Sequence, residues 1–176
     1  MTSTLELSVI GNSTISALLD KDARIVWGCF PRFDGDPTFC ALLNNGGEDE
    51  TGSFNIDLFD KVRSEQQYRR NSAIVVTTLF DDSGNVVEIT DFAPRFKQFG
   101  RVFRPTMLVR HIRPLNGTPR VCIRLRPAFD HGAQRPARTR GSNHIRYVMP
   151  DLTLRLTTDA AISYIDEEVP FVLESP

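Results

Sequence analysis

Apolar and polar side chains alternate with a period of two residues along much of this chain, and this pattern constrains the fold more than any other. Such alternation is typical of β-strands that bury one face and expose the other. It first covers residues 5–9, 15–19 and 24–30, with turn-forming residues at 11–14 and 20–23. The sequence therefore predicts a meander of three strands at its N-terminal end.

Further strands are predicted around turn sequences. Residues 74–80 and 86–92 are rich in β-branched side chains and flank a cluster of Asp, Ser, Gly and Asn, which predicts a hairpin. Residues 107–112 and 121–125 flank Asn116-Gly117, a dipeptide that favours a tight turn. We predict that these two segments pair with each other.

The C-terminal part of the chain continues the β pattern. Residues 146–149, 152–157 and 162–165 are predicted strands. Residues 131–143 are rich in Gly, Arg and Pro and contain almost nothing apolar, which predicts a long exposed loop. Many short strands with turns about every eight to twelve residues are typical of a sandwich. We therefore predict a single all-β domain over residues 1–176, an antiparallel β-sandwich that is complete or truncated at its last strands.

One short helix is predicted near residues 37–43. Asp36 precedes this segment and would cap the first turn, because its carboxylate can accept hydrogen bonds from free N–H groups. Pro37 would occupy the first helical position, where the missing N–H has no cost.

Charge is unevenly distributed although the formal net charge is only −1. Residues 95–146 carry 13 Lys and Arg against a single Asp, whereas residues 147–176 carry one Arg against six Asp and Glu. The basic segment could bind phosphates through Arg135, Arg138 and Arg140, or it could form the outer faces of strands and dock on an acidic partner. We favour the second interpretation and expect no nucleic-acid partner.

Several classes of site are absent from the sequence. The three histidines lack a carboxylate or thiol at ligand spacing, and the three cysteines form no zinc motif. Phosphate-binding and dinucleotide-binding glycine motifs are also missing. The first residues lack the basic region and following apolar stretch that are typical of a signal peptide, and the sequence contains no apolar run of 18 residues. We expect a cytoplasmic protein with no metal, no cofactor and no membrane partner.

Several ordered motifs resemble the opening of bacterial and archaeal family 15 glycoside hydrolases, which include glucoamylases, glucodextranases and trehalases. No single motif is diagnostic, but the order and spacing of the motifs over about residues 8–132 are diagnostic. The motifs are Ile10-Gly11-Asn12, the run from Arg24 to Asp34, Val87 to Pro94, Leu108-Val109-Arg110, and Arg126 to Gly132. One departure is Asp22-Ala23, where the family commonly has Asp-Gly.

The resemblance implies an N-terminal supersandwich joined to an (α/α)6 helical barrel, whose two glutamates hydrolyse α-glucosidic bonds with inversion. Such a pair stands about 6.5–9.5 Å apart to admit a water. Nothing in this chain can be that pair, and the chain contains no helical repeat of such a barrel, so we predict no catalytic residue and no activity for the chain alone. The resemblance implies an accessory domain that stabilises the barrel of the same protein, which binds trehalose or an α-glucan. The alternative is a free-standing carbohydrate-binding or protein-interaction module.

The candidate substrate-binding residues are Trp27, Arg32, Phe33 and Asp34. Aromatic faces pack on sugar C–H groups, and Arg32 and Asp34 could bind hydroxyls at the edge of a glucose pocket. Alternatively, Trp27 and Phe33 are core residues, and Arg32 pairs with Asp34 or Asp36 to fix a turn. We interpret the corners at residues 91–94 and 126–130 as structural, with Asp130 accepting backbone N–H bonds. A surface that normally meets a barrel would also favour self-association of the chain.

Overall fold

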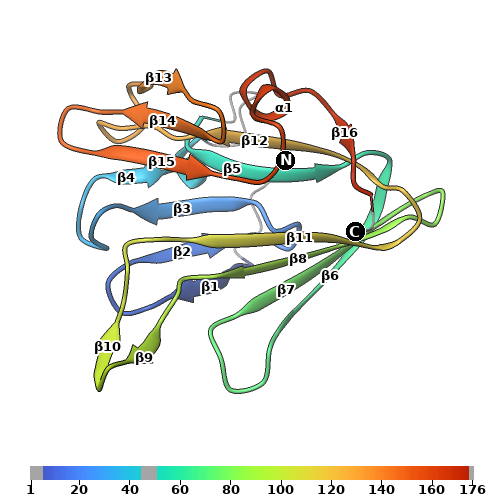
Figure 1. Ribbon diagram of the computed structural model, residues 1–176, viewed down its shortest axis with the longest axis horizontal. Helices are drawn as coiled ribbons and strands as arrows, with labels where there is room; N and C mark the ends of the chain where they lie inside the picture. The colour runs from blue at the N-terminus through green and yellow to red at the C-terminus, as the bar shows by residue number, and fades with distance from the viewer. Residues whose placement is uncertain (1–5, 45–50, 175–176) are drawn as a thin grey trace.

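The larger of two main antiparallel sheets runs through the centre of the molecule (Figure 1). The computed structural model describes residues 6–44 and 51–174. In these residues the sheet has the order β1-β2-β3-β5-β12-β16, and β4 pairs with β3. Its strands are β1 (Ser8–Gly11), β2 (Ser16–Leu19), β3 (Ile25–Cys29), β4 (Pro37–Phe39), β5 (Ser53–Leu58), β12 (Arg120–Arg126) and β16 (Phe171–Val172).

A second antiparallel sheet has the order β11-β8-β7-β6 and shares one core with the first. Its strands are β6 (Lys61–Tyr68), β7 (Val75–Asp81), β8 (Val86–Phe92) and β11 (Val109–Asn116). A three-stranded sheet is formed by β13 (Ala137–Arg140), β14 (His144–Val148) and β15 (Thr153–Thr157). Between β8 and β11, the strands β9 (Phe96–Gln98) and β10 (Arg101–Phe103) form a separate hairpin.

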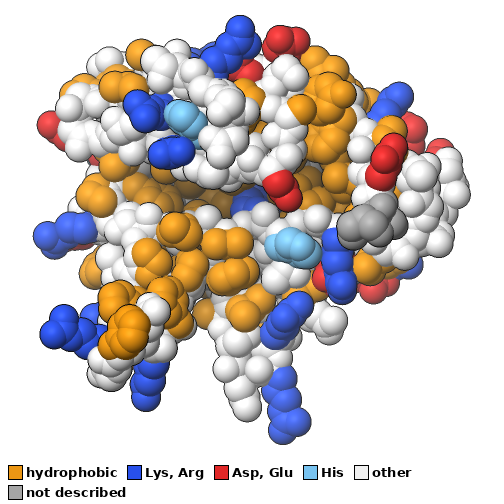
Figure 2. Space-filling model, viewed as in Figure 1, with side chains coloured by type: hydrophobic (Ala, Val, Ile, Leu, Met, Phe, Trp, Pro, Cys, Tyr) orange, Lys and Arg blue, Asp and Glu red, His pale blue; other side chains and the backbone are white. Residues whose placement is uncertain are grey.

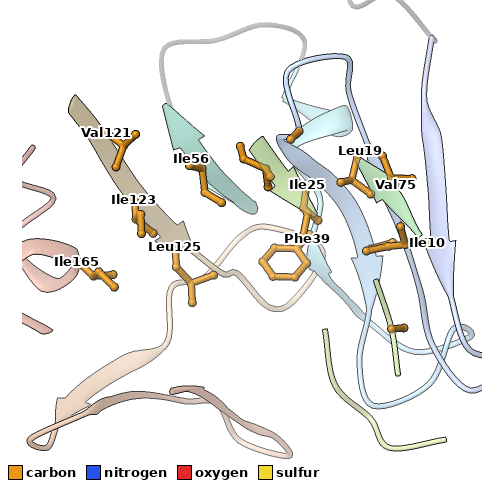
Figure 3. Close-up of a cluster of buried hydrophobic side chains, with 14 of the residues drawn as sticks. Ile10, Leu19, Ile25, Phe39, Ile56, Val75, Val121, Ile123, Leu125 and Ile165 are labelled. Atoms are coloured by element: carbon orange, nitrogen blue, oxygen red, sulfur yellow. The ribbon is translucent and has the colours of Figure 1, made fainter. Parts of the chain in front are cut away.

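The hydrophobic core is a single cluster of buried side chains from these sheets (Figure 3). Ile10, Leu19 and Ile25 from the larger sheet meet Val75 and Ile89 from the second sheet. The short helix α1 (Ile162–Asp166) packs on β12 and adds two buried isoleucines to the cluster. Burial of each such side chain stabilises the fold by about 1.5–3 kcal/mol. The fold is thus the predicted all-β antiparallel sandwich.

The predicted meander and the predicted hairpin are both confirmed. β1, β2 and β3 pair in chain order, and β7 pairs with β8 over the whole hairpin. The Asp81 carboxylate accepts the N–H groups of Ser83 and Asn85 at 2.9 and 2.8 Å, so side-chain bonds close the turn. In the first meander Ala23 has a φ of 60°, a left-handed conformation that favours the glycine common in similar sequences.

The predicted pairing of residues 107–112 with 121–125 is wrong. β11 pairs with β8 in the second sheet, whereas β12 pairs with β5 in the larger sheet. The turn at Gly117 exists, with a φ of 68°, but it carries the chain from one sheet to the other. The Asn-Gly dipeptide predicts a reversal of direction, and alternation predicts which face is buried. Neither determines which strand becomes the neighbour.

The predicted helix over 37–43 is wrong in its first half. Pro37–Phe39 form β4, and only Ala41–Leu43 form a short 3-10 helix. β4 pairs with β3 and its residues are buried, so sheet pairing outweighs the local helix signal. Asp36 caps a different segment, which is described below.

Two predictions in the C-terminal part are also corrected. The segment 131–143 is exposed, as predicted, but it contains β13, which pairs with β14. Residues 162–165 form a helix and not a strand. Ile162 and Ile165 are three residues apart, a spacing that places both side chains on one helical face toward β12.

Candidate functional site

Three of the four predicted substrate-binding residues lie in one exposed turn between β3 and β4. Arg32 donates two hydrogen bonds to the Asp34 carboxylate, from Nε at 2.9 Å and from Nη2 at 2.8 Å. This bonding holds the pKa of Asp34 below its ordinary value. The Gly35 N–H donates to the Arg32 carbonyl at 3.1 Å and closes the turn. Arg32 therefore pairs with Asp34, as the structural alternative predicted.

The same alternative is wrong for Phe33. Its side chain lies between the two charged residues in sequence and is 65% exposed, so it is not part of the core. Aromatic faces pack on apolar groups, and charged groups form strong hydrogen bonds. The exposed turn therefore offers both an apolar face and hydrogen-bonding groups.

Trp27 lies apart from this turn. It belongs to β3, where it is half-buried and stands opposite Leu18 of β2. Gly28 to Pro31 separate it from Arg32 along the chain. The structure thus brings Arg32, Phe33 and Asp34 together and leaves Trp27 within the sheet.

Asn12, from the first motif of the resemblance, has a structural role. Its side chain is 2% exposed, and its Nδ2 donates to the carbonyls of Pro94 and Pro105 at 3.0 and 2.8 Å. Its Oδ1 accepts the N–H groups of Thr14 and Ile15. One buried amide therefore ties the β1–β2 turn to both ends of the segment that carries β9 and β10.

The corner at residues 91–94 is structural, as predicted. The buried Asp91 carboxylate accepts hydrogen bonds from Arg110 Nε and Nη2 at 2.8 and 3.2 Å. Arg110 also donates to the carbonyls of Phe54 and Ala23, and its guanidinium lies 4.5 Å from the centre of the Phe54 ring. This arginine joins the second sheet to the larger one.

The corner at residues 126–130 is also structural, but its acceptor is not Asp130. The backbone N–H groups of Asp130 and His131 both donate to the Asp36 carboxylate, at 2.6 and 2.9 Å. Both residues have positive φ, 55° and 54°, so their N–H groups converge on one anion. Asp36, predicted to cap a helix, instead fixes this turn.

Several arginines of the basic segment are paired with acidic residues of the same chain. Arg138 and Arg140 pair with Asp166 at 3.0 and 3.1 Å, and Arg126 is bound by Glu168. Arg135 donates to the Thr51 hydroxyl at 2.8 Å. The three arginines considered for phosphate binding are therefore engaged within the domain, which supports the interpretation that these side chains have a structural role.

Two of the cavities among the described residues have walls from distant segments, so no sequence pattern indicated either of them. One has a volume of about 310 Å³ and includes Arg126, Tyr147 and Glu168 in its lining. Burial raises the pKa of Tyr147 to about 12, so this phenol stays neutral. The other, of about 150 Å³, includes Asp20 and Asp22. Asp20 accepts the N–H groups of its own turn, and Asp22 pairs with Lys61 at 2.6 Å.

Residues 6–44 and 51–174 contain no group of three or more His, Cys, Asp or Glu arranged to hold a metal ion. Within the same ranges, no helix has the length and apolar character needed to cross a bilayer.

Comparisons with known proteins place these motifs in a family. The family of trehalase-like N-terminal domains matches residues 2–157. Trehalase 1 of Sulfolobus acidocaldarius is 32% identical over 148 residues, and the trehalase of Thermoplasma volcanium is 25% identical over 127 residues. These matches cover 82% and 72% of this chain but only 23% and 20% of the relatives. No solved structure shows a significant match. The chain therefore belongs to the trehalase-like N-terminal domain family.

Proposed function

We propose that this domain is the non-catalytic N-terminal accessory domain of an α-glucoside hydrolase of the trehalase or glucoamylase type. The match to the trehalase-like N-terminal family over residues 2–157 carries the proposal. In this role the domain stabilises a helical-barrel catalytic domain of the same polypeptide, which binds trehalose or an α-glucan. The corner residues Asp36, Asp91 and Arg110 support a structural role, because each holds the sandwich together.

The exposed turn at residues 32–34 is the part of the domain that we propose to contact sugar. Phe33 supplies an apolar face, while the paired Arg32 and Asp34 hold their polar groups in a fixed geometry. Trp27 lies within β3, apart from the turn, and we do not include it in the proposed contact. In the alternative role, Arg32 and Asp34 only stabilise the turn through their ion pair and do not contact sugar.

Kinetics of the complete polypeptide that carries this domain would test the turn. We expect Arg32→Ala and Phe33→Ala to raise the KM for trehalose or maltose about tenfold, a loss of roughly 1.4 kcal/mol in binding. Arg63→Ala is the matched control, because Arg63 and Glu65 form a similar exposed pair two residues apart on β6. Unchanged KM values in both Arg32→Ala and Phe33→Ala would leave the turn a purely structural role.

A free-standing carbohydrate-binding or protein-interaction module is the second candidate function. Calorimetric titration of the 176-residue chain with trehalose and maltose separates the two, because an autonomous module binds sugar without a barrel. We expect no heat of binding and no hydrolysis from the chain alone. Heat of binding that Phe33→Ala abolishes would favour the autonomous module.

We also propose that the domain is cytoplasmic. Cys29, Cys40 and Cys122 are buried, unpaired thiols, and burial raises the pKa of each. Unpaired thiols are usual in reducing compartments, where disulfides are rare. Fractionation of the source cells, with detection of this domain by antibody, tests the location.

A further inference from the structure

The hairpin formed by β9 and β10 projects from the sandwich and its strands pair with neither main sheet (Figure 1). All six residues of its strands are exposed. Phe96 and Phe103 face each other across the strands and stack with ring centres 5.5 Å apart, yet remain 47% and 39% exposed. We call residues 95–104 the arm. An isolated two-stranded hairpin gains little stability in water.

The base of the arm is nevertheless firmly held. The Asn12 amide binds the carbonyls of Pro94 and Pro105, which flank the arm on either side. Arg95 donates to the Ser13 hydroxyl at 3.3 Å. These bonds fix the point at which the arm leaves the sandwich, so its tip is presented at a defined place.

The tip of the arm is costly for folding. Phe99 and Gly100 are the central residues of the turn, with φ values of 50° and 71°. Such turns strongly favour Asn-Gly or Asp-Gly, and a bulky residue at positive φ is strained. Phe99 is also 89% exposed. A phenylalanine at this position therefore stabilises neither the backbone of the turn nor the core of the domain. This indicates that Phe99 has a role in binding.

The charges of the arm differ from those in the rest of the basic segment. Elsewhere the arginines are mostly bound to carboxylates of the chain; those with ion pairs are Arg110, Arg113, Arg124, Arg126, Arg138 and Arg140. In the described part of the chain, no carboxylate lies within ion-pair distance of Arg95, Lys97, Arg101 or Arg104. Figure 2 shows the result, in which apolar and basic side chains project together from this corner of the molecule.

We propose that the arm is a docking element that places Phe99 in an apolar hollow with an acidic rim on the catalytic domain of the same polypeptide. The inference rests on the proposed function. The trehalases similar to this chain are four to five times its matched length, since the matches cover 20–23% of them. The family is N-terminal by description, so a much larger body of protein follows this domain in its members. The four cations of the arm, which have no ion pair among the described residues, would be complemented by acidic groups on the surface that receives them.

Hydrogen exchange tests the docking directly. Amides of residues 95–104 are compared between the 176-residue chain and the complete polypeptide. We expect exchange at least tenfold slower in the complete polypeptide, and we expect Phe99→Asn to remove that protection. Equal exchange rates in the two proteins would overturn the proposal. Hydrolysis of trehalose or maltose by the complete polypeptide is measured in parallel, so that a failure of the proposed function is recognised separately.

Phe99→Asn is informative because its effects on folding and on docking have opposite signs. Asn-Gly suits the turn, so the melting temperature of the 176-residue chain should rise, whereas the arm of the complete polypeptide should lose protection. A lower melting temperature of the chain alone would show that Phe99 serves folding, against the proposal. Leu115→Asn is the matched control: Leu115 is 48% exposed at the other end of β11 and should leave exchange of the arm unchanged.

Other partners of the arm would give distinct results. A dimer of the complete polypeptide that Phe99→Asn dissociates in light scattering would identify a second copy as the partner and overturn docking on the catalytic domain. Sedimentation of the chain with vesicles of phosphatidylcholine and phosphatidylserine, abolished by the same substitution, would identify an anionic membrane instead. Lys97→Glu with Arg101→Glu should reduce protection of the arm in the complete polypeptide, because acidic groups on the partner would then repel it.

Discussion

The Asp91 carboxylate and the Arg110 guanidinium form an ion pair inside the sandwich, with Arg110 Nε 2.8 Å from Asp91 Oδ1. Their side chains are 0% and 4% exposed. Asp91 is on β8 and Arg110 on the neighbouring β11, while Arg110 also binds carbonyls of the larger sheet. The ion pair thus lies within the second sheet, and Arg110 connects it to the larger sheet through hydrogen bonds to those carbonyls.

Removal of one partner from this pair should be strongly destabilising. We expect Asp91→Ala to reduce the free energy of unfolding by about 3–5 kcal/mol, because the Arg110 charge is left buried without a counter-ion. Urea denaturation of the 176-residue chain measures the change. Glu65→Ala, which breaks an exposed pair on β6, should cost less than about 1 kcal/mol. Similar losses in the two variants would contradict the structural role of the buried pair.

Asn12→Ala should both destabilise the sandwich and release the arm. Two carbonyls and two N–H groups lose their bonds to the side chain, with an expected cost of about 2–4 kcal/mol. Asn12→Asp keeps the bonds to Thr14 and Ile15 but places a carboxylate against the two proline carbonyls. Nuclear relaxation of residues 95–104 should report a more mobile arm in both variants, and an arm as rigid as in the unmodified chain would refute this role.

Glu168 should make stability depend on acid pH. Hydrogen bonding from Arg126 holds the pKa of this carboxyl below its ordinary value of 4.5. Because the folded state lowers the pKa, the pair stabilises the domain fully above pH 4.5, and this contribution is lost as the pH falls through the folded-state pKa. Glu168→Gln should therefore reduce the free energy of unfolding by about 1 kcal/mol at neutral pH. In this variant the free energy of unfolding should also decline less steeply as the pH falls. Denaturation curves between pH 7 and about pH 3 measure how the free energy of unfolding changes with pH. Parallel declines in the unmodified chain and in Glu168→Gln would contradict a contribution from Glu168.

Asp36→Ala should loosen the turn at residues 130–131 without unfolding the domain. The carboxylate accepts two backbone N–H bonds there, and we expect a loss of about 1–2 kcal/mol. Amide exchange at Asp130 and His131 should accelerate more than exchange in the core strands. Asp151→Ala, which removes an exposed carboxylate elsewhere, serves as the control. Unchanged exchange at both amides would show that the turn does not depend on Asp36.

Local patterns predicted those parts of the fold in which neighbouring residues also pair with each other. The β7–β8 hairpin is the clearest case, because alternation and the side-chain bonds of Asp81 act within one short segment. Pairing of β12 with β5 was not predictable, because alternation determines which face of a strand is buried but not which strand lies beside it in the sheet. The strand predicted at residues 162–165 was wrong for a different reason. A segment of four residues with an apolar residue at each end fits one helical turn as well as it fits a strand.

The candidate site was predicted only in part. The Arg32–Asp34 pair followed from spacing and charge, but exposure of Phe33 depends on how the turn leaves β3. The arm was not predicted although a signal existed: Gly100, a turn-forming residue, lies within a run of basic and aromatic residues at 95–104. The lack of carboxylates near those basic residues emerges only in three dimensions, because the acidic partners of the other arginines come from distant segments.

The position of β5 between β3 and β12 determines when the larger sheet can be completed during synthesis. β5 shares one residue pair with β3 and six with β12, and the whole second sheet is encoded between β5 and β12. At about 5–20 residues per second, the ribosome releases β5 roughly 3–12 s before its main neighbour. The larger sheet thus has an open edge until Arg126 has emerged. A nascent chain that stalls in the second sheet should be a substrate for chaperones, whereas one that has passed β12 should not.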